Sequence, residues 1–471
     1  MGNAADDVRG NREGWHAVLF AAGCAGVAIA AAVAIVLVVS RHGANSPAPV
    51  VQKSESIAKR ALTPTPEVVR YKFEVRPTVG STPVDSLAGL EALEQRVAAS
   101  AQPSALDLGE LADFYLRRAI LNADPRDYDK AEETAKRSLA VLPEPNGAIM
   151  TIAKVATARH DFKKAIEIAS DYAIHGSGTG AFQILATSYL AIGELEKAAA
   201  AAELMVGAKP TTGAFFTRAL VEQAQGRDVE AEYDFEHAVV LEEQGDLPES
   251  ARLRTLWGRF LLRRGDAVGA KLCFDEAVRI VPDYPLAVSN QAELALRTGH
   301  PTEAKALFEK AFVSTRLVRY LIDEARAQEA GGDRDGADRT RTQVEKLVRA
   351  ELAAGGFGHS LELVEVLVDR GQPADLVEAI SVGREEVERR GSADVKFQLA
   401  RAYARSNKRF EGLPLIHSTL ASGARDARFY ELASKLEAMD GNQPRAAMYE
   451  KEAVAMDPGG PAWRALGMTP R

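Results

Sequence analysis

The amino-acid sequence predicts an all-α solenoid of about ten helical hairpins, preceded by one transmembrane helix. Small residues recur in two parallel series every 33–41 residues, and glycines recur between the members of most pairs, which predicts the solenoid. An uncharged stretch near the N-terminus predicts the transmembrane helix. The chain accordingly divides into a tail (1–16), the transmembrane helix (17–39), a linker (40–84), the solenoid (85–458) and a C-terminal tail (459–471).

The membrane segment runs from Ala17 to Val39 and contains no charge. As a helix it is long enough to cross the hydrocarbon core, which is about 30 Å thick. A cleaved signal peptide would have a basic start and a small-residue cleavage site, and neither is present. A lipoprotein would be modified at Cys24, yet the apolar run continues 15 residues beyond it. We therefore expect an uncleaved single-pass anchor in a bacterial inner membrane.

The sequence gives only a weak indication of the side of the membrane on which the solenoid lies. Basic residues both precede and follow the segment: Arg9, Arg12, Arg41, Lys53, Lys59 and Arg60. The positive-inside count is close to a tie and tilts toward the cytoplasm. In bacteria, however, a short-tailed N-terminal anchor commonly exports the domain attached to it. We expect the extracytoplasmic side, and the cytoplasmic side is the alternative.

The anchor also carries a stripe of small residues, Ala22, Gly26, Ala30 and Ala34. Small residues four apart let two helices approach closely in lipid, so the stripe predicts a homodimer formed through the anchor. An alanine-rich span also produces such stripes by composition alone. Both interpretations stay open.

The linker is rich in Pro, Ser and Thr, which favours an extended spacer. Within it, Val69, Tyr71, Phe73 and Val75 alternate with charged residues, which predicts a strand over 68–76. That strand either lies against the helical array or pairs with a partner, and we expect the former.

After the linker, a helix is predicted to begin at Asp85, with Leu87, Leu90, Leu93 and Val97 on one face. We interpret it as a cap for the N-terminal end of the helical array.

Two series of small positions define ten units. The first series comprises Ala112, Ala153, Ala186, Ala219, Gly258, Ala292, Ala325, Val364, Ala400 and Ser434. The second comprises Ala131, Ala165, Ala198, Ala231, Ala270, Ala304, Ala337, Leu376, Gly412 and Ala446. Two antiparallel helices approach closely where small side chains face each other, so each pair predicts one helical hairpin.

The unit at 181–210 reads AFQILATSYLAIGELEKAAAAAELMVGAKP. It resembles the tetratricopeptide repeat family in Phe182, Leu185, Ala186, Tyr189, Gly193, Ala198, Ala202, Met205 and Pro210. The resemblance extends over 105–458. It implies that glycines end the first helices in a left-handed conformation, at Gly193, Gly226, Gly265, Gly299, Gly332, Gly371 and Gly441. It also implies that Pro143, Pro210, Pro282 and Pro458 end second helices.

Three units depart from the pattern. In the first, ILNADPR is expected to lengthen the turn between the helices. In the seventh, Arg341 replaces an apolar residue, and in the eighth the small pair becomes Val364 and Leu376. Longer links at 242–250 and 353–360 are expected to divide the solenoid into sub-blocks.

The composition excludes several classes of function. A net charge of -8 and a pI near 5.7 argue against a nucleic-acid partner. Two cysteines, Cys24 and Cys273, and scattered histidines give no metal-binding pattern. We find no phosphate-binding loop or nucleophile motif, and only a short tail lies beyond Pro458. We expect no cofactor, no metal and no enzymatic activity.

The resemblance implies binding of a protein partner along the concave face formed by the first helices. We expect a membrane-anchored scaffold that recruits or assembles an envelope complex. A regulatory subunit that tethers a separate envelope enzyme is the alternative, and an enzyme with an unrecognised site is the remote one.

The residues expected to meet the partner are Arg252, Arg259, Arg263, Asn290, Arg297, Arg319 and Arg326. Related arrays bind the C-terminal carboxylate of a peptide with basic and asparagine side chains of successive first helices. In this sequence Asn290 stands where the family has an asparagine, and Arg319 where it has a lysine. Arg259 and Asp323 depart from this pattern, which puts that clamp in doubt. The arginines would instead receive an acidic peptide segment through bidentate hydrogen bonds. Alternatively, they pair with Glu293, Asp323 and Glu329 from the same helices.

Overall fold

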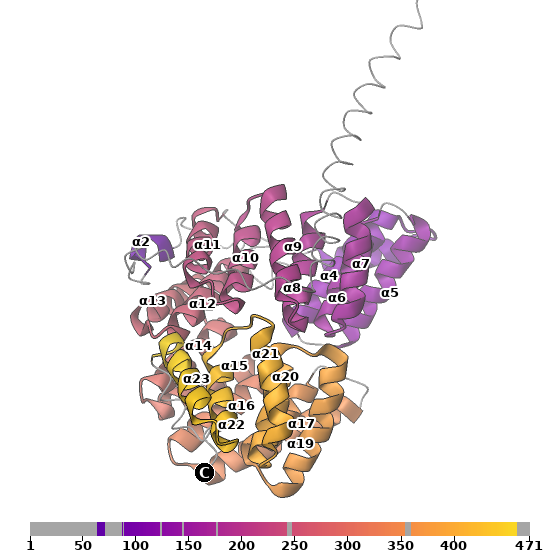
Figure 1. Ribbon diagram of the computed structural model, residues 1–471. Helices are drawn as coiled ribbons and strands as arrows, with labels where there is room; N and C mark the ends of the chain where they lie inside the picture. Colours follow the sequence, from indigo (N-terminus) through magenta and orange to yellow (C-terminus); the bar gives the residue numbers. More distant parts are fainter. Residues whose placement is uncertain are drawn as a thin grey trace, which may run out of the picture. The chain divides into compact units, whose positions relative to one another are not determined.

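The computed structural model describes residues 64–70, 87, 89–122, 125–143, 146–175, 178–242, 247–353 and 359–458. Every regular element in these ranges is a helix (Figure 1). None of these helices combines the length and the hydropathy that a membrane span requires. The expected anchor, 17–39, and its small-residue stripe lie outside the described residues.

Twenty helices, α4–α23, form the ten hairpins in chain order. Hairpins 1–5 consist of α4 (Ala105–Asn122) and α5 (Pro125–Val141), α6 (Ala148–Ala158) and α7 (Phe162–His175), α8 (Thr179–Ile192) and α9 (Leu195–Ala208), α10 (Thr212–Ala224) and α11 (Asp228–Val240), and α12 (Leu247–Arg263) and α13 (Ala267–Ile280). Hairpins 6–10 consist of α14 (Pro285–Arg297) and α15 (Pro301–Thr315), α16 (Val318–Ala330) and α17 (Arg334–Ala353), α18 (Ser360–Arg370) and α19 (Pro373–Arg390), α20 (Ala393–Arg405) and α21 (Arg409–Ala421), and α22 (Ala427–Met439) and α23 (Gln443–Met456).

The small positions lie where the sequence places them, at the helix–helix contacts. All twenty are buried except Ser434, which is half-buried in hairpin 10, the last that the structure describes. The seven turn glycines all have φ between 69° and 87°, the left-handed region in which a residue without Cβ is favoured. Helices α5, α9, α13 and α23 each end within two residues of the predicted proline. Both features of the hairpin pattern are confirmed.

The capping helix is also confirmed, but it begins at Leu90 and not at Asp85, because Gly89 before it has a left-handed backbone conformation. Helix α3 (Leu90–Ala99) buries Leu90, Leu93 and Val97. These side chains share one apolar cluster with Leu108, Leu111 and Phe114 of α4, and Leu87 packs against its edge. The apolar face of the first hairpin is thereby covered.

The first helices lie on the inner side of the array. Each first helix packs against the first helix of the next hairpin, from α4 with α6 to α20 with α22, except at α10 and α12. Successive second helices do not approach each other as closely. An array whose helices converge on one side curves toward that side. We call the surface of the first helices the inner face.

The expected long turn in hairpin 1 does not form. Helix α4 continues to Asn122 and α5 begins at Pro125, so most of the inserted residues extend the two helices. The stretch ILN continues the helical pattern, and proline is well accommodated in the first turn of a helix because it needs no hydrogen-bond acceptor there.

The strand expected over 68–76 is wrong at its start. Val68 and Val69 belong to a short helix, α2 (Pro66–Val69), and residues 71–76 lie outside the described residues. Pro66 favours the helical turn, and Val69 is buried in a core cluster with residues of α10–α13. The expectation that this segment lies against the array is confirmed for 66–69, since α2 contacts α11 and α13.

The two longer links have different consequences. Across 353–360, α16 still packs on α18 and one apolar cluster continues from Val344 to Leu363, so the array is not divided. Across 242–250, α10 and α12 are the one pair of successive first helices without a close approach among the described residues. The core nevertheless continues there, because Phe235 stacks on Trp257 at 6.2 Å between ring centroids.

The last hairpins pack on turns that lie far earlier in the chain. The backbone N–H of Arg425 donates to the carbonyl oxygen of Ala224 at 3.0 Å, and Leu195 is buried among residues of hairpins 9 and 10. The Nη1 of Arg390 lies 2.9 Å from the Nδ1 of His160. The loop before hairpin 10 thus meets the turn of hairpin 4, six hairpins earlier. We call this set of contacts the closure contacts.

Candidate partner-binding site

The residue directly after each small position of a first helix lies on the inner face. From hairpin 5 to hairpin 9 these residues alternate in charge: Arg259, Glu293, Arg326, Glu365 and Arg401. At hairpin 10 the alternation stops at Lys435. Burial and the neighbouring Arg405 lower the pKa of Lys435 to about 8. The inner face of the C-terminal half is therefore a ladder of charged side chains.

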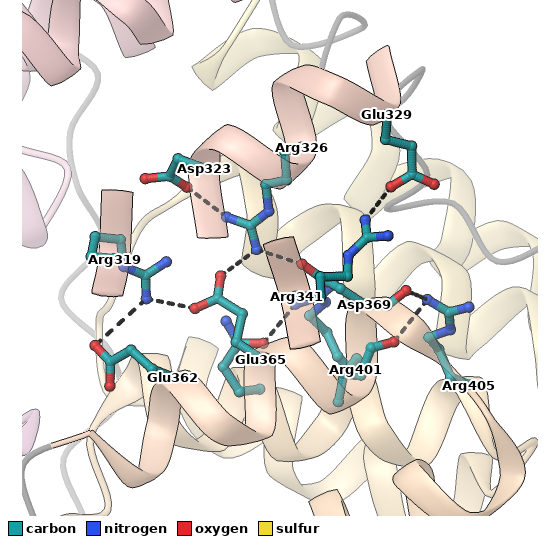
Figure 2. Close-up of polar contacts among 12 residues, drawn as sticks. Arg319, Asp323, Arg326, Glu329, Arg341, Glu362, Glu365, Asp369, Arg401 and Arg405 are labelled. Atoms are coloured by element: carbon teal, nitrogen blue, oxygen red, sulfur yellow. Dashed lines mark hydrogen bonds and ion pairs between the residues drawn. The ribbon is translucent and has the colours of Figure 1, made fainter. Parts of the chain in front are cut away.

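Between α16 and α18 the arginines and carboxylates of the ladder pair with one another (Figure 2). Arg319 lies 2.5 Å from Glu365. Arg326 donates to Glu365 and lies 3.0 Å from Asp323 and from Asp369. Burial opposes the ionisation of Glu365, but Arg319 and Arg326 hold its pKa well below the usual range. The carboxylate is charged at neutral pH, and both arginines are neutralised within the chain.

The bonding continues from α18 to α20. Arg401 lies 2.7 Å from Asp369, and Arg405 donates to the carbonyl oxygen of Val368 at 2.8 Å. In the upper right of Figure 2, Arg341 of α17 pairs with Glu329. Arg341 is buried, so this pairing explains how an arginine occupies a position that is usually apolar.

Two further predicted arginines take part in the closure contacts. Arg263, at the end of α12, lies 3.4 Å from Asp426. Arg297, at the end of α14, lies 3.3 Å from Glu293 and 3.0 Å from Asp457. Each pairs with an acid that precedes or follows a C-terminal helix.

Arg259 differs from all of these. It is half-buried on α12, and no carboxylate of the described residues lies within ion-pair distance of it. Among the described residues its buried Nε has no hydrogen-bond partner; the same holds for the Nε of Arg326, but Arg326 has carboxylate partners at its other two nitrogens. Burial, together with the neighbouring charge of Arg263, lowers the pKa of Arg259 to about 10, so it is still a cation at neutral pH. Buried polar groups are normally hydrogen-bonded, so Arg259 has unused bonding capacity.

The remaining two predicted residues lie apart from this set. Asn290 is buried and donates to the carbonyl oxygen of Leu286 at 2.7 Å, which leaves its Oδ1 without a partner. Arg252 is half-buried, pairs with Glu249 at 3.1 Å and lies over the ring of Phe216 at 4.8 Å.

Sequence reasoning anticipated part of this arrangement. Arg319 and Arg326 are brought together, and the expected pairs Arg297–Glu293 and Arg326–Asp323 form. Glu329 pairs with Arg341 instead. The acids of α18, with Arg401 and Arg405, were missed. The alternation of charge directly after the small positions was a signal for Glu365 and Arg401, but not for Asp369 or Arg405.

Among the described residues, no group of three or more His, Cys, Asp or Glu side chains is arranged to hold a metal ion. Cys273 is fully buried, and burial raises the pKa of its thiol. A buried thiol of that kind is protonated and poorly nucleophilic.

The hairpins, their turn glycines and their small contact positions together define a tetratricopeptide-type solenoid. Arrays of this type generally mediate protein–protein interactions. No known family model matches the sequence, and no curated protein matches it.

Three solved structures are similar in fold. A chain of the APC/C hetero-tetramer Cut9–Hcn1 aligns with a TM-score of 0.46 and 11% identity over 79% of this chain, which spans 62% of that chain's length. The human IFIT1 dimer with PPP-AAAA aligns with a TM-score of 0.43 and 13% identity, and the alignment covers 78% of this chain and 94% of that one. A tetratricopeptide repeat protein from Parabacteroides merdae aligns with a TM-score of 0.38 and 18% identity, and the alignment covers 50% of this chain and 92% of that one. At these values the fold class rests on the hairpins themselves.

Proposed function

We propose that this protein is a membrane-anchored scaffold that recruits or assembles an envelope complex by receiving an acidic segment of a partner on its inner face. The observation that carries the proposal is Arg259, the one predicted inner-face arginine that has no carboxylate within ion-pair distance among the described residues and whose buried Nε has no hydrogen-bond partner there. A partner carboxylate would supply the missing acceptor.

The charges around Arg259 favour an anionic ligand. Arg263 and Arg428 are nearby cations that share Asp426, and the further nearby acid Asp394 is paired with Arg428. Glu293, the next acid of the ladder, is 3.3 Å from Arg297. A guanidinium binds a carboxylate through two parallel hydrogen bonds, which are stronger than neutral ones. An acidic peptide therefore fits this position better than a neutral or basic one.

The membrane part of the proposal rests on residues 17–39, whose length and lack of charge suit a single span. We place the protein in a bacterial inner membrane with the array on the extracytoplasmic side. The stripe from Ala22 to Ala34 would let two anchors associate. An alkaline-phosphatase fusion at the C-terminus reports the side, and an inactive fusion would reverse this assignment.

The binding site is tested with the full-length protein in detergent and a short fluorescein-labelled peptide of alternating glutamate and serine. Arg259→Gln is expected to weaken binding by at least tenfold, because the charge-assisted hydrogen bonds are lost. Arg279→Gln is the matched control, since Arg279 is an exposed arginine on the outer helix α13. Equal affinities for the wild type and Arg259→Gln would contradict the proposal.

A partner in the membrane is tested in the same way. Proteins that co-purify with the wild type from solubilised membranes, and that are lost with Arg259→Gln but kept with Arg279→Gln, are specific to the inner face. Arg263 is less suitable for such a variant, because its loss also removes the contact with Asp426.

A further inference from the structure

Helix α2 fills a slot at the junction of hairpins 4 and 5. It contacts α11 and α13, which are both second helices, so the slot lies on the outer side of the array. Pro64 packs closely on α13, since a Cβ at Gly269 would lie 2.9 Å from the Cδ of Pro64. Val69 is buried in the same core cluster as Phe235 and Trp257. A segment of the linker is thus part of the folded array.

The end of α2 is held by a buried arginine. Arg254 of α12 donates through Nε to the carbonyl oxygen of Val69 at 2.6 Å. Its guanidinium also binds both carboxylate oxygens of Glu242, at 2.7 and 2.8 Å. Ser250 completes the set, with its hydroxyl 2.7 Å from Glu242. If α2 left, the Nε of Arg254 would lose its acceptor in a site that is closed to solvent.

The slot and the proposed partner site are connected by one helix. Arg254 and Arg259 lie five residues apart on α12, the former toward α2 and the latter on the inner face. This is also the junction at which α10 and α12 do not approach each other closely. On its inner side α12 meets α10 only through side chains, such as Arg252 over the ring of Phe216, so the contacts with α2, α13 and Glu242 help to fix its position.

We propose that docking of residues 66–69 positions α12 and thereby sets the affinity of the inner face for an acidic segment. This inference rests on the proposed function of Arg259. The short linker helix is then an intramolecular regulator: when it is docked, Arg259 is held ready for the ligand, and when it is released, the ligand must order α12 itself. Binding to a preorganised site costs less conformational entropy.

The test uses full-length protein, the glutamate–serine peptide and hydrogen exchange. Val69→Asp places a charge in the core and is expected to release α2. Exchange should rise in α2 and in the N-terminal half of α12, and peptide affinity should fall by about fivefold or more. Thr65→Asp is the matched control, because it adds the same charge at an exposed position of the same segment. Because Thr65 is the N-cap of α2, where a carboxylate is favourable, exchange in α2 should not rise and peptide affinity should not fall.

A second variant separates release from unfolding. Val69→Ala removes only two methyl groups and is expected to shift exchange and affinity in the same direction by a smaller amount. An unchanged far-ultraviolet circular-dichroism spectrum confirms that the array is folded in both variants.

The outcomes distinguish this inference from the function on which it rests. If exchange rises and affinity is unchanged while Arg259→Gln still weakens binding, the regulation is wrong and the partner site stands. If α2 stays protected in Val69→Asp, docking does not depend on Val69 and the inference is likewise overturned. If Arg259→Gln binds the peptide as well as the wild type does, the partner site itself is wrong.

Discussion

Arg297 and Asp457 lie 3.0 Å apart although 160 residues separate them in the chain. Both side chains are largely buried, and Arg297 also donates to the carbonyl oxygen of Leu262. The pair therefore ties the end of hairpin 10 to hairpins 5 and 6. It is one of the few inner-face ion pairs that joins distant hairpins rather than neighbours.

Arg297→Met should weaken the closure contacts, because it leaves Asp457 buried without its partner. Removing one member of a buried ion pair costs roughly 3 kcal/mol. Hydrogen exchange in 443–456 should rise more than in hairpins 1 and 2. Arg279→Met is the comparison, since that pair is exposed and contributes about 1 kcal/mol or less. Equal exchange in both variants would show that Arg297 does not hold the end of the array.

Glu365→Gln should destabilise the array far more than the corresponding change at Glu362 on the same helix. It removes the carboxylate shared by Arg319 and Arg326, at a cost of about 3–5 kcal/mol. Glu362→Gln is the matched control on the same helix, because Glu362 lies 3.8 Å from Arg319 and forms no other ion pair among the described residues. Its expected cost is about 1 kcal/mol or less. Urea unfolding of the two variants decides the point, and similar midpoints would contradict it.

Glu222 should make stability depend on pH. Burial, followed by the neighbouring charge of Asp234, raises the pKa of Glu222 to about 8. The folded state then holds a proton that the unfolded state releases above about pH 4.3. Stability therefore falls as the pH rises from about 4.3 to about 8.

Glu222→Gln removes this dependence, because an amide does not titrate. We expect equal stability of variant and wild type near pH 4, and a variant more stable by about 1–3 kcal/mol at pH 8. Glu230→Gln is the control, since Glu230 is exposed on α11. Parallel stability curves for wild type and Glu222→Gln between these pH values would refute the assignment.

Gly258 and Gly213 should respond to alanine in opposite directions. A Cβ at Gly258 would lie 2.6 Å from the ring of Phe274 and 2.9 Å from the Cβ of Cys273. Overpacking of this kind costs about 1–3 kcal/mol. A Cβ at Gly213 meets nothing within 4 Å. There alanine should stabilise α10 by up to about 1 kcal/mol, because the unfolded chain loses freedom. Thermal unfolding midpoints measure both effects.

The hairpins were predictable because their contacts are local. Ala186 and Ala198 face each other within one unit, and Gly193 between them ends a helix. The residues of a single repeat are therefore enough to predict its hairpin. The sequence shows that Arg341 departs from the repeat pattern, but it does not show which acid pairs with Arg341, because Glu329 lies on the preceding helix among several other acids. Local pattern therefore determined the elements and left the choice of ion-pair partners open.

The closure contacts and α2 were not predictable in the same way. Nothing in the residues near Arg297 indicates Asp457, because small curvatures accumulated over several hairpins bring them together. Val69 alternates with polar neighbours, which favours a strand on local grounds, and the apolar slot between α11 and α13 prevails over that tendency. Tertiary burial decides the conformation of such short segments.

The closure contacts also bear on how the protein folds. In an open repeat array, each unit touches only its neighbours, and the chain can unfold from either end one unit at a time. Here Arg390 meets His160 across 230 residues, so long loops must close before these contacts form. Folding should accordingly be slower and more cooperative than its helical content suggests. Deletion of hairpin 10 should therefore destabilise hairpins 4 and 5, which are remote from it in sequence and adjacent to it in the native state.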